Sequence, residues 1–323
     1  MPKKKNKDNR ENQEYWNKRA RLDKLKVIKT GEQGIDSLKR LLALNLKSVK
    51  KQIEAFYDKY GEEFADMLSY EEVRKYKSKL RAKARLNPQD KTLQKILKKD
   101  IPIYKISRLR QLETDIQIML TEATVGQQRG IYNTLKDVAT VSQATTVKRF
   151  ANGLDLVFHK IADKKLEKIL SSNWSGAKWS DRLWKDRELV GQKVTAILEE
   201  GMPQGWSMQR MTRELQNQTG VLFRDAFRLI RTEASFVDSQ VKLEEFKQAK
   251  DELGYTRYLY DAFHDSRTSD DCRKLDEESK EKGGFPIDEA EIGVNFPPMH
   301  PNCRSTCVLD TSSIEDNLDD LMR

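Results

Sequence analysis

The sequence predicts a mainly α-helical protein, in which an elongated helical N-terminal and central region is followed by a small, loop-rich α+β domain. Before Gly254, apolar residues recur at steps of three and four, which is the spacing of one helix face. After Gly254, short aromatic segments alternate with turn residues, and all three cysteines lie in this last part. A chain of 323 residues also exceeds the usual size of one core, so at least two domains are expected.

The chain begins with a basic, polar segment that has no apolar periodicity, MPKKKNKDNRENQEY. We predict a disordered arm over residues 1–15. Such an arm suits contact with a polyanion, and its candidate DNA-binding side chains are Lys3, Lys4, Lys5, Lys7 and Arg10.

Charge is distributed unevenly along the chain. Residues 1–150 hold 35 Lys and Arg against 19 Asp and Glu, a net charge of +16, whereas residues 151–323 hold 25 against 32, a net charge of −7. The basic half favours non-specific binding to double-stranded DNA. The plainer interpretation, a solvated surface of lysine-rich helices, stays open on charge alone. No apolar run approaches the roughly 18 residues of a membrane helix, so a soluble protein made in the cytosol is expected.

Residues 16–164 are interpreted as a basic helical domain. Its first apolar stripe comprises Ile35, Leu38, Leu42, Leu46, Val49, Ile53 and Phe56. Ser69 followed by Glu72 forms a capping-box pattern, which predicts a second helix that stops before residues 87–88, Asn-Pro. A third stripe over residues 106–123 predicts another helix. Further helix is expected over residues 132–170, with an interruption at residues 152–153.

Residues 165–253 are interpreted as a helical core. Three tryptophans at steps of five, Trp174, Trp179 and Trp184, are expected to anchor a helix junction rather than to stack on bases. A helix is predicted to end at Gly201, and Ser207 is a candidate N-cap for the next one. A separate last helix is expected to contain Ala226, Leu229, Ile230 and Ala234.

Residues 254–309 are predicted to form the small α+β domain. The segment YTRYLY reads as a strand, and a second strand is expected near residues 285–287. Loops should dominate residues 261–301, which are rich in Asp, Gly and Pro. Residues 310–323 form an acidic tail.

Cysteine and histidine in this domain have a spacing that suits zinc. His300 precedes Cys303 by three residues, so one turn can supply two ligands, and Cys272 can supply a third. Cys307, His264 or an aspartate could complete the shell of a structural Zn²⁺. Serine stands at 269 and at 305, where a second cysteine would complete each closely spaced pair. Reduced, buried cysteines beside a hydrogen-bonded histidine are therefore the competing interpretation.

An enzyme is the alternative class. A zinc-dependent hydrolase or a nuclease would use Asp261, His264, Asp265 and His300. Cys303 near His300 also supplies the residue types of a nucleophile and its base. The HExxH helix of many zinc hydrolases is missing from the sequence.

Five short motifs follow one another along the chain: WSDRLW at 179–184, GMPQGWS at 201–207, RLIRTEASFVDSQ at 228–240, HDSRT at 264–268 and PPMHPNCR at 297–304. Their order is similar to that of the head-morphogenesis, or Mu F-like, family of phage minor head proteins. The resemblance covers about residues 165–309. It implies a noncatalytic virion component inside the capsid, assembled in the host cytoplasm beside the portal protein, a scaffold or major capsid protein, and the packaged DNA.

The same resemblance assigns roles to individual residues. Arg231, Thr232 and Glu233 match the RTE signature of the family, and Asp265 and Arg267 match its DSRT loop. We interpret both motifs as structural hubs that join a helix to the small domain. The resemblance also favours Cys272, His300 and Cys303 as ligands if metal is present, with Cys307 as a displaced fourth.

Overall fold

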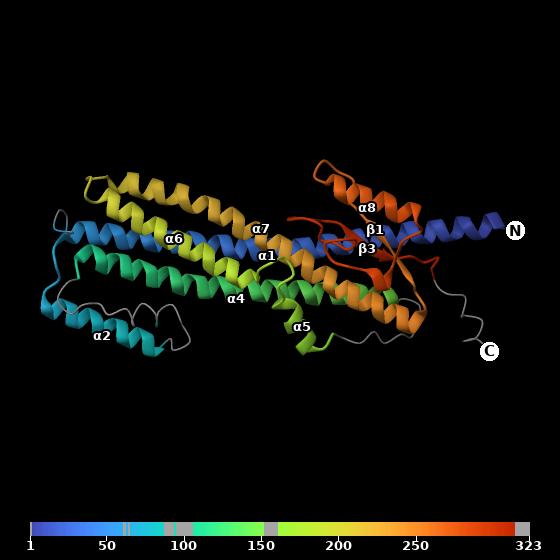
Figure 1. Cartoon of the computed structure of the whole chain (residues 1–323), viewed down its shortest axis with the longest axis horizontal. Coiled ribbons are helices and arrows are strands. Elements are labelled where there is room, and N and C mark those ends of the chain that lie inside the picture. Colours follow the sequence, from blue (N-terminus) through green and yellow to red (C-terminus); the bar gives the residue numbers. More distant parts are fainter. Residues whose placement is uncertain are drawn as a thin grey trace. The chain divides into compact units, whose positions relative to one another are not determined.

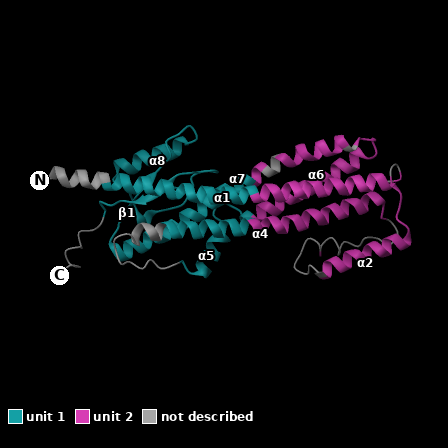
Figure 2. Ribbon diagram, turned by 180° about the vertical axis from the view of Figure 1, so that it is seen from behind, with its two compact units in different colours: residues 1–36, 131–179, 227–323 teal, residues 37–130, 180–226 magenta. Residues whose placement is uncertain are grey.

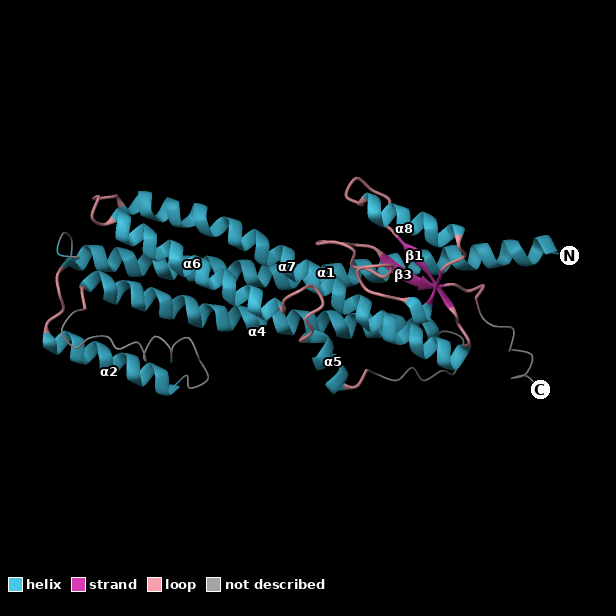
Figure 3. Cartoon of the chain, in the orientation of Figure 1, coloured by secondary structure: helices cyan, strands magenta, loops and turns pink. Residues whose placement is uncertain are grey.

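The computed structural model describes residues 2–60, 63, 65–86, 94, 106–151 and 161–313. This part is mainly helical and ends in a small antiparallel sheet, which confirms the predicted fold class (Figures 1 and 3). Its helices are α1 (Pro2–Tyr60), α2 (Tyr70–Leu86), α4 (Arg108–Ala151), α5 (Asp163–Leu170), α6 (Trp179–Gly201), α7 (Met208–Leu253) and α8 (Asp270–Glu281). No described helix is both long enough and apolar enough to cross a membrane.

The chain forms two compact units, each assembled from separate segments. Unit 1 comprises residues 1–36, 131–179 and 227–323, and unit 2 comprises residues 37–130 and 180–226 (Figure 2).

Helix α1 begins at Pro2, within the segment for which the sequence predicts a disordered arm. Proline suits the first turn of a helix, and no glycine or further proline follows before Gly31, so helix propensity continues without a break. The side chains of Lys3, Lys4, Lys5, Lys7 and Arg10 lie outside the described part of the structure.

The core of unit 2 is built from the predicted apolar stripes. Val49, Ile53 and Phe56 of α1 are buried in one cluster with Leu112 and Ile116 of α4. The α6 and α7 helices complete the cluster with Val194, Ile197, Leu198, Met211 and Leu215. Each stripe repeats every three or four residues, so each helix buries one face.

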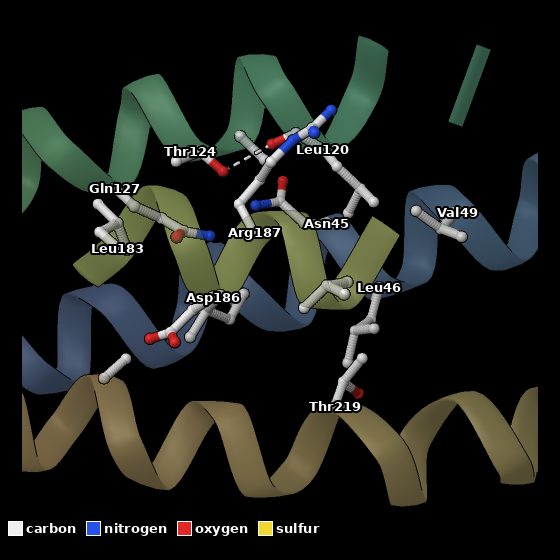
Figure 4. Close-up of a pocket in the computed structure, with 14 residues that line it drawn as sticks. Asn45, Leu46, Val49, Leu120, Thr124, Gln127, Leu183, Asp186, Arg187 and Thr219 are labelled. Carbon is white, nitrogen blue, oxygen red and sulfur yellow. Dashed lines mark hydrogen bonds between the residues drawn. The ribbon is translucent and has the colours of Figure 1, made fainter. Parts of the chain in front are cut away.

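A pocket in unit 2 has mainly aliphatic walls (Figure 4). Leu46, Leu120 and Leu183 line it, and the Thr124 hydroxyl donates a 2.8 Å hydrogen bond to the Leu120 carbonyl of its own helix. The few polar side chains at its wall include Asn45, Asp186 and Arg187. Burial, followed by the charge of Asp225, raises the pKa of Asp186.

The capping box at the start of α2 is confirmed. The Ser69 backbone N–H donates to Glu72 Oε2 at 2.8 Å, and the Glu72 N–H donates to Ser69 Oγ at 3.3 Å. This exchange satisfies two backbone donors that a helix start leaves free. The described helix ends at Leu86, directly before the predicted Asn-Pro stop. The predicted interruption at residues 152–153 lies outside the described residues.

The prediction of two separate helices after Ser207 is wrong. Residues 208–253 form the single helix α7 of 46 residues, and the Ser207 hydroxyl accepts a 3.2 Å hydrogen bond from the Arg210 N–H as the predicted N-cap. No proline interrupts this stretch, and a helix tolerates the lone Gly220 at a cost of about 1 kcal/mol. The helix therefore continues through residues 226–234.

Unit 1 contains the small sheet, in the order β2-β1-β3 with antiparallel neighbours. Its strands are β1 (Arg257–Asp261), β2 (Phe285–Pro286) and β3 (Thr306–Leu309), and the 3-10 helix η2 (Ile287–Glu289) follows β2. The sequence predicted β1 and β2, whereas it did not predict β3. Tyr258 pairs with Phe285 on one side and with Leu309 on the other, so β1 is the central strand.

Helix α8 corrects the expectation that loops dominate residues 261–301. Its start carries clear signals, because Ser269 accepts from the Cys272 N–H and two aspartates occupy the first turn. Its buried residues are Cys272, Asp276 and Ser279. Their spacing of four and three is helical, but they are polar or small, so the buried face has no apolar periodicity to reveal it.

A buried charge network fastens the sheet to the helices of unit 1. Asp238 of α7 is fully buried and accepts from Lys24 Nζ at 2.8 Å and from Lys242 Nζ at 3.0 Å. Ser142 of α4 donates to its other oxygen at 2.7 Å. Lys242 also donates to the Thr306 hydroxyl of β3 at 2.9 Å. One carboxylate thus links α1, α4 and α7, and through Lys242 the sheet.

Two of the predicted tryptophan anchors lie in unit 1. Trp179 is buried and donates to the Leu170 carbonyl at 2.8 Å. Trp174 stacks on Phe236 of α7 with ring centroids 4.6 Å apart. In unit 2, the third tryptophan donates to a glutamine of α4.

Candidate metal centre

Cys272 is positioned by the first turn of α8. The Ser269 cap holds its backbone N–H at 3.3 Å, and its side chain is buried against β1. The Tyr260 hydroxyl, from the central strand, donates to Cys272 Sγ at 3.2 Å. Helix start and strand therefore fix this sulfur from two directions.

His300 and Cys303 are brought together by a tight turn before β3. The Cys303 N–H donates to the His300 carbonyl at 3.1 Å. Asn302 has a φ of 61°, in the left-handed region that asparagine tolerates better than most residues. Its N–H donates to the Thr232 hydroxyl of α7 at 3.2 Å, which attaches the turn to the helix.

The three predicted ligands converge. Cys272 Sγ lies 3.8 Å from Cys303 Sγ and 3.3 Å from His300 Nε2, and all three ligand atoms lie within 4.8 Å of one another. Zinc bonds of about 2.3 Å to sulfur and 2.0–2.1 Å to nitrogen give tetrahedral edges of about 3.8 Å and 3.5 Å. The donor types and these two spacings therefore fit Zn²⁺.

His300 has its second nitrogen engaged. Nδ1 lies 2.9 Å from the Pro301 carbonyl, which requires the proton on Nδ1. The lone pair of Nε2 is then directed toward Cys272, as a metal ligand needs.

Cys307 does not join this group among the described residues. It lies in β3 opposite Tyr260 and is completely buried. Cys307 follows Ser305 by two residues, which is about 7 Å along an extended chain, so it is too far along the strand to complete the shell. Ser305 instead forms a hydrogen bond with Cys272 and is itself buried.

The two clustered thiols are electrostatically unequal. The hydrogen bond from Cys272, aided by backbone groups of Met299 and Ser305, lowers the pKa of Cys303 to about 5 against the effect of burial. The same hydrogen bond, followed by burial, raises the pKa of Cys272 to about 12. In the metal-free protein the thiolate of Cys303 is therefore favoured over that of Cys272. A cation is needed to stabilise both cysteines as thiolates.

The RTE residues on α7 make three different contacts. Arg231 is exposed and pairs with Glu32 of α1 at 2.5 Å. Thr232 accepts from Asn302, as described above, and donates to the Arg228 carbonyl. Buried Glu233 accepts a 3.0 Å hydrogen bond from Trp174 Nε1.

The DSRT loop is held by Asp265. Its carboxylate accepts from Arg304 at 2.5 Å and from the Arg267 N–H at 2.9 Å, and these hydrogen bonds hold the pKa of Asp265 well below its usual range. The Arg267 side chain lies 3.9 Å from the same carboxylate. Because Arg304 directly follows Cys303, this pair links the loop to the turn that carries Cys303.

Asp261 and His264 of the enzyme alternative each pair with another side chain. Asp261 accepts two hydrogen bonds from Arg21 at 2.6 and 2.7 Å. His264 Nε2 lies 2.8 Å from the buried Asp276. Among the described residues, only Cys272, His300 and Cys303 form a group of three or more that could hold a metal.

Sequence reasoning missed Asp276, Tyr260 and the role of Ser305. Asp276 lies on the unpredicted helix α8, and the other two are known only from the pairing of β1 with β3. The alternation of aromatic residues in YTRYLY was the one available signal, because it places Tyr258 and Tyr260 on one face of the strand.

Residues 192–308 match the model of the family described as Phage Mu protein F like protein. The resemblance predicted from the five motifs is thereby confirmed over little more than a third of the chain, from the middle of α6 through β3. No curated protein matches the chain. No solved structure matches it either.

Proposed function

We propose that the chain is a minor head protein of a tailed phage, which acts in head morphogenesis inside the procapsid and contacts the portal and the packaged DNA. The match of residues 192–308 to a phage family carries this proposal. The noncatalytic interpretation rests on the same family match. Capsid interior is the proposed location, after assembly in the host cytoplasm.

Incorporation into particles tests this function. Procapsids and filled heads are purified on density gradients from cells that produce the phage, and the chain is detected by peptide mass spectrometry. We expect it in both particle types at low copy, with cross-links to the portal and to a scaffold or major capsid protein. A chain that stays at the top of the gradient, apart from both particles, would overturn the proposal.

We further propose that Cys272, His300 and Cys303 hold a structural Zn²⁺. Two sulfurs and one imidazole nitrogen are zinc donors, and the distances from Cys272 Sγ to the other two fit tetrahedral edges. When bound, zinc would stabilise both cysteines as thiolates and join the start of α8 to the turn before β3. The alternative, reduced cysteines packed beside a hydrogen-bonded histidine, predicts the same fold without metal.

The zinc content of the protein distinguishes a zinc site from reduced cysteines without metal. Protein purified without chelator should contain one zinc per chain by elemental analysis. Cys303→Ser should remove it and lower the melting temperature of the region around the sheet, because metal-binding free energy is folding free energy there. Cys307→Ser is the matched control, since this cysteine is buried but outside the group, and zinc should remain stoichiometric. Ser305→Cys should retain zinc at higher chelator concentrations. Wild-type protein without stoichiometric metal would contradict the zinc site.

A further inference from the structure

Helix α2 carries an unusually dense positive charge. Between Val73 and Leu86 it has seven Lys and Arg and no acidic residue. Its apolar face is a narrow stripe of Val73, Tyr76, Leu80 and Ala84, buried together with Ile118 of α4. Figure 1 shows α2 beside the first part of α4, which belongs to the same compact unit. The remaining faces of α2 present cations to solvent.

Six of these seven cations form two rows with different surroundings, and Lys77 belongs to neither. Each residue is rotated by about 100° from the previous one along a helix. Lys75, Lys79 and Lys83 follow one another at steps of four, and form one row on the wheel. Each pairs with an acid: Glu71 at 2.9 Å, Asp115 at 4.0 Å and Glu122 at 2.9 Å, respectively.

The second row consists of Arg74, Arg81 and Arg85, which we call the arginine row. Steps of seven and four place the three within about 40° of one another. All three are exposed, and within the described residues none of them has an ion pair or a side-chain hydrogen bond. The lysine row is therefore neutralised by its own unit, whereas the arginine row keeps its charge and its donors for another molecule.

We propose that the arginine row is a surface that binds the phosphate backbone of duplex DNA. Guanidinium groups donate two parallel hydrogen bonds to a phosphate, which makes arginine better suited than lysine to this contact. The row spans about 16 Å along the helix, which is the rise of about five phosphates on one DNA strand. It contains no side chain that reads base edges, so binding is independent of sequence.

DNA is the occupant that the charge distribution favours. The surface lies in the half of the chain that carries +16, and the inference rests on the proposed function in placing the chain beside packaged DNA. It adds a DNA contact on α2 to the one predicted for the N-terminal cations. Binding by purified protein is independent of particle incorporation, so the two proposals can fail separately.

Two triple variants of the full chain test this surface. In one, Arg74, Arg81 and Arg85 are replaced by Gln; in the other, Lys75, Lys79 and Lys83 are replaced by Gln. Both remove three charges from one helix at similar helix propensity, and circular dichroism checks that both fold. Binding of a mixed-sequence DNA duplex is measured by filter retention between about 50 and 200 mM salt.

We expect the arginine variant to lower the slope of log Kobs against log salt by about 2 to 3, and to weaken binding about tenfold or more at low salt. The lysine variant should change the slope by less than about 1, because its charges are already paired. Equal effects of the two variants, or none from the arginine variant, would overturn the proposal. So would loss of binding to phosphatidylserine vesicles with DNA binding unchanged, because a membrane surface would then be the occupant.

Discussion

Asp238 shows what a single residue contributes to this fold. Burial alone would raise the pKa of this carboxyl group, but the ammonium groups of Lys24 and Lys242 outweigh burial and hold the pKa well below its usual range. A carboxyl group with a lowered folded-state pKa stabilises the fold above its unfolded pKa of about 3.9. That contribution is lost as the pH falls through the folded-state value.

Asp238→Asn should therefore destabilise unit 1 by about 3 to 5 kcal/mol at pH 7, since it leaves two buried ammonium groups without their carboxylate. Urea denaturation of both proteins gives the difference. The difference in unfolding free energy should become smaller below about pH 4, where the wild-type carboxyl group begins to lose its stabilising contribution. A difference that stays constant from pH 7 to pH 3 would show that the charge of Asp238 is not responsible.

The pocket of unit 2 supplies a second residue-level prediction. Asn45 Nδ2 is buried there and has no hydrogen-bond partner among the described residues. Asn45→Leu removes this unsatisfied donor and adds apolar contact with the aliphatic wall, so unfolding should require about 1 kcal/mol more. Thermal denaturation measures the change. A lower melting temperature would indicate that the amide is solvated or paired in solution.

At the scale of elements, the start of α2 depends on its capping box. Ser69→Ala should cost about 1 kcal/mol of the free energy of unfolding, because the Glu72 N–H loses its side-chain acceptor. Ser78→Ala is the control, since Ser78 is exposed in the middle of the same helix, and alanine should be neutral or slightly stabilising there. Equal costs at the two positions would argue that the cap contributes nothing.

The elements that the sequence revealed were those with an apolar period or a recognisable cap. The stripe through Val49, Ile53 and Phe56, the box at Ser69 and the cap at Ser207 were all identified in this way. Strand β3 and helix α8 were missed because their buried faces include Cys272, Asp276 and Thr306, which are polar or small and contact residues outside their own elements.

The candidate site was also predictable only where local sequence spacing indicates it. The HPNC spacing indicated His300 and Cys303, and the scarcity of cysteine indicated Cys272. The exclusion of Cys307 required the register of β3 against β1, which pairs it with Tyr260. Local spacing can reveal ligands that share a turn, but a ligand from another strand is fixed only by tertiary structure.

At the scale of the whole molecule, unit 1 depends on its first segment. Residues 1–36 supply Arg21 to Asp261 and Lys24 to Asp238. Deletion of residues 1–36 should therefore make residues 227–313 sensitive to protease, while residues 37–60 and 106–130 stay protected within unit 2. Limited proteolysis with mass spectrometry locates the cleavage sites. Equal resistance of residues 227–313 in both proteins would refute this dependence.

The distance in sequence between Lys24 and Asp238 also sets an order of events during synthesis. The two residues are 214 positions apart. A ribosome that adds 5–20 residues per second reaches Asp238 about 10 to 40 s after Lys24. All of unit 2 emerges in that interval, because its last residue is 226. A nascent chain that stops before α7 is complete therefore leaves Lys24 without its carboxylate partner. Unit 1 can bury Lys24 only after α7 has been synthesised.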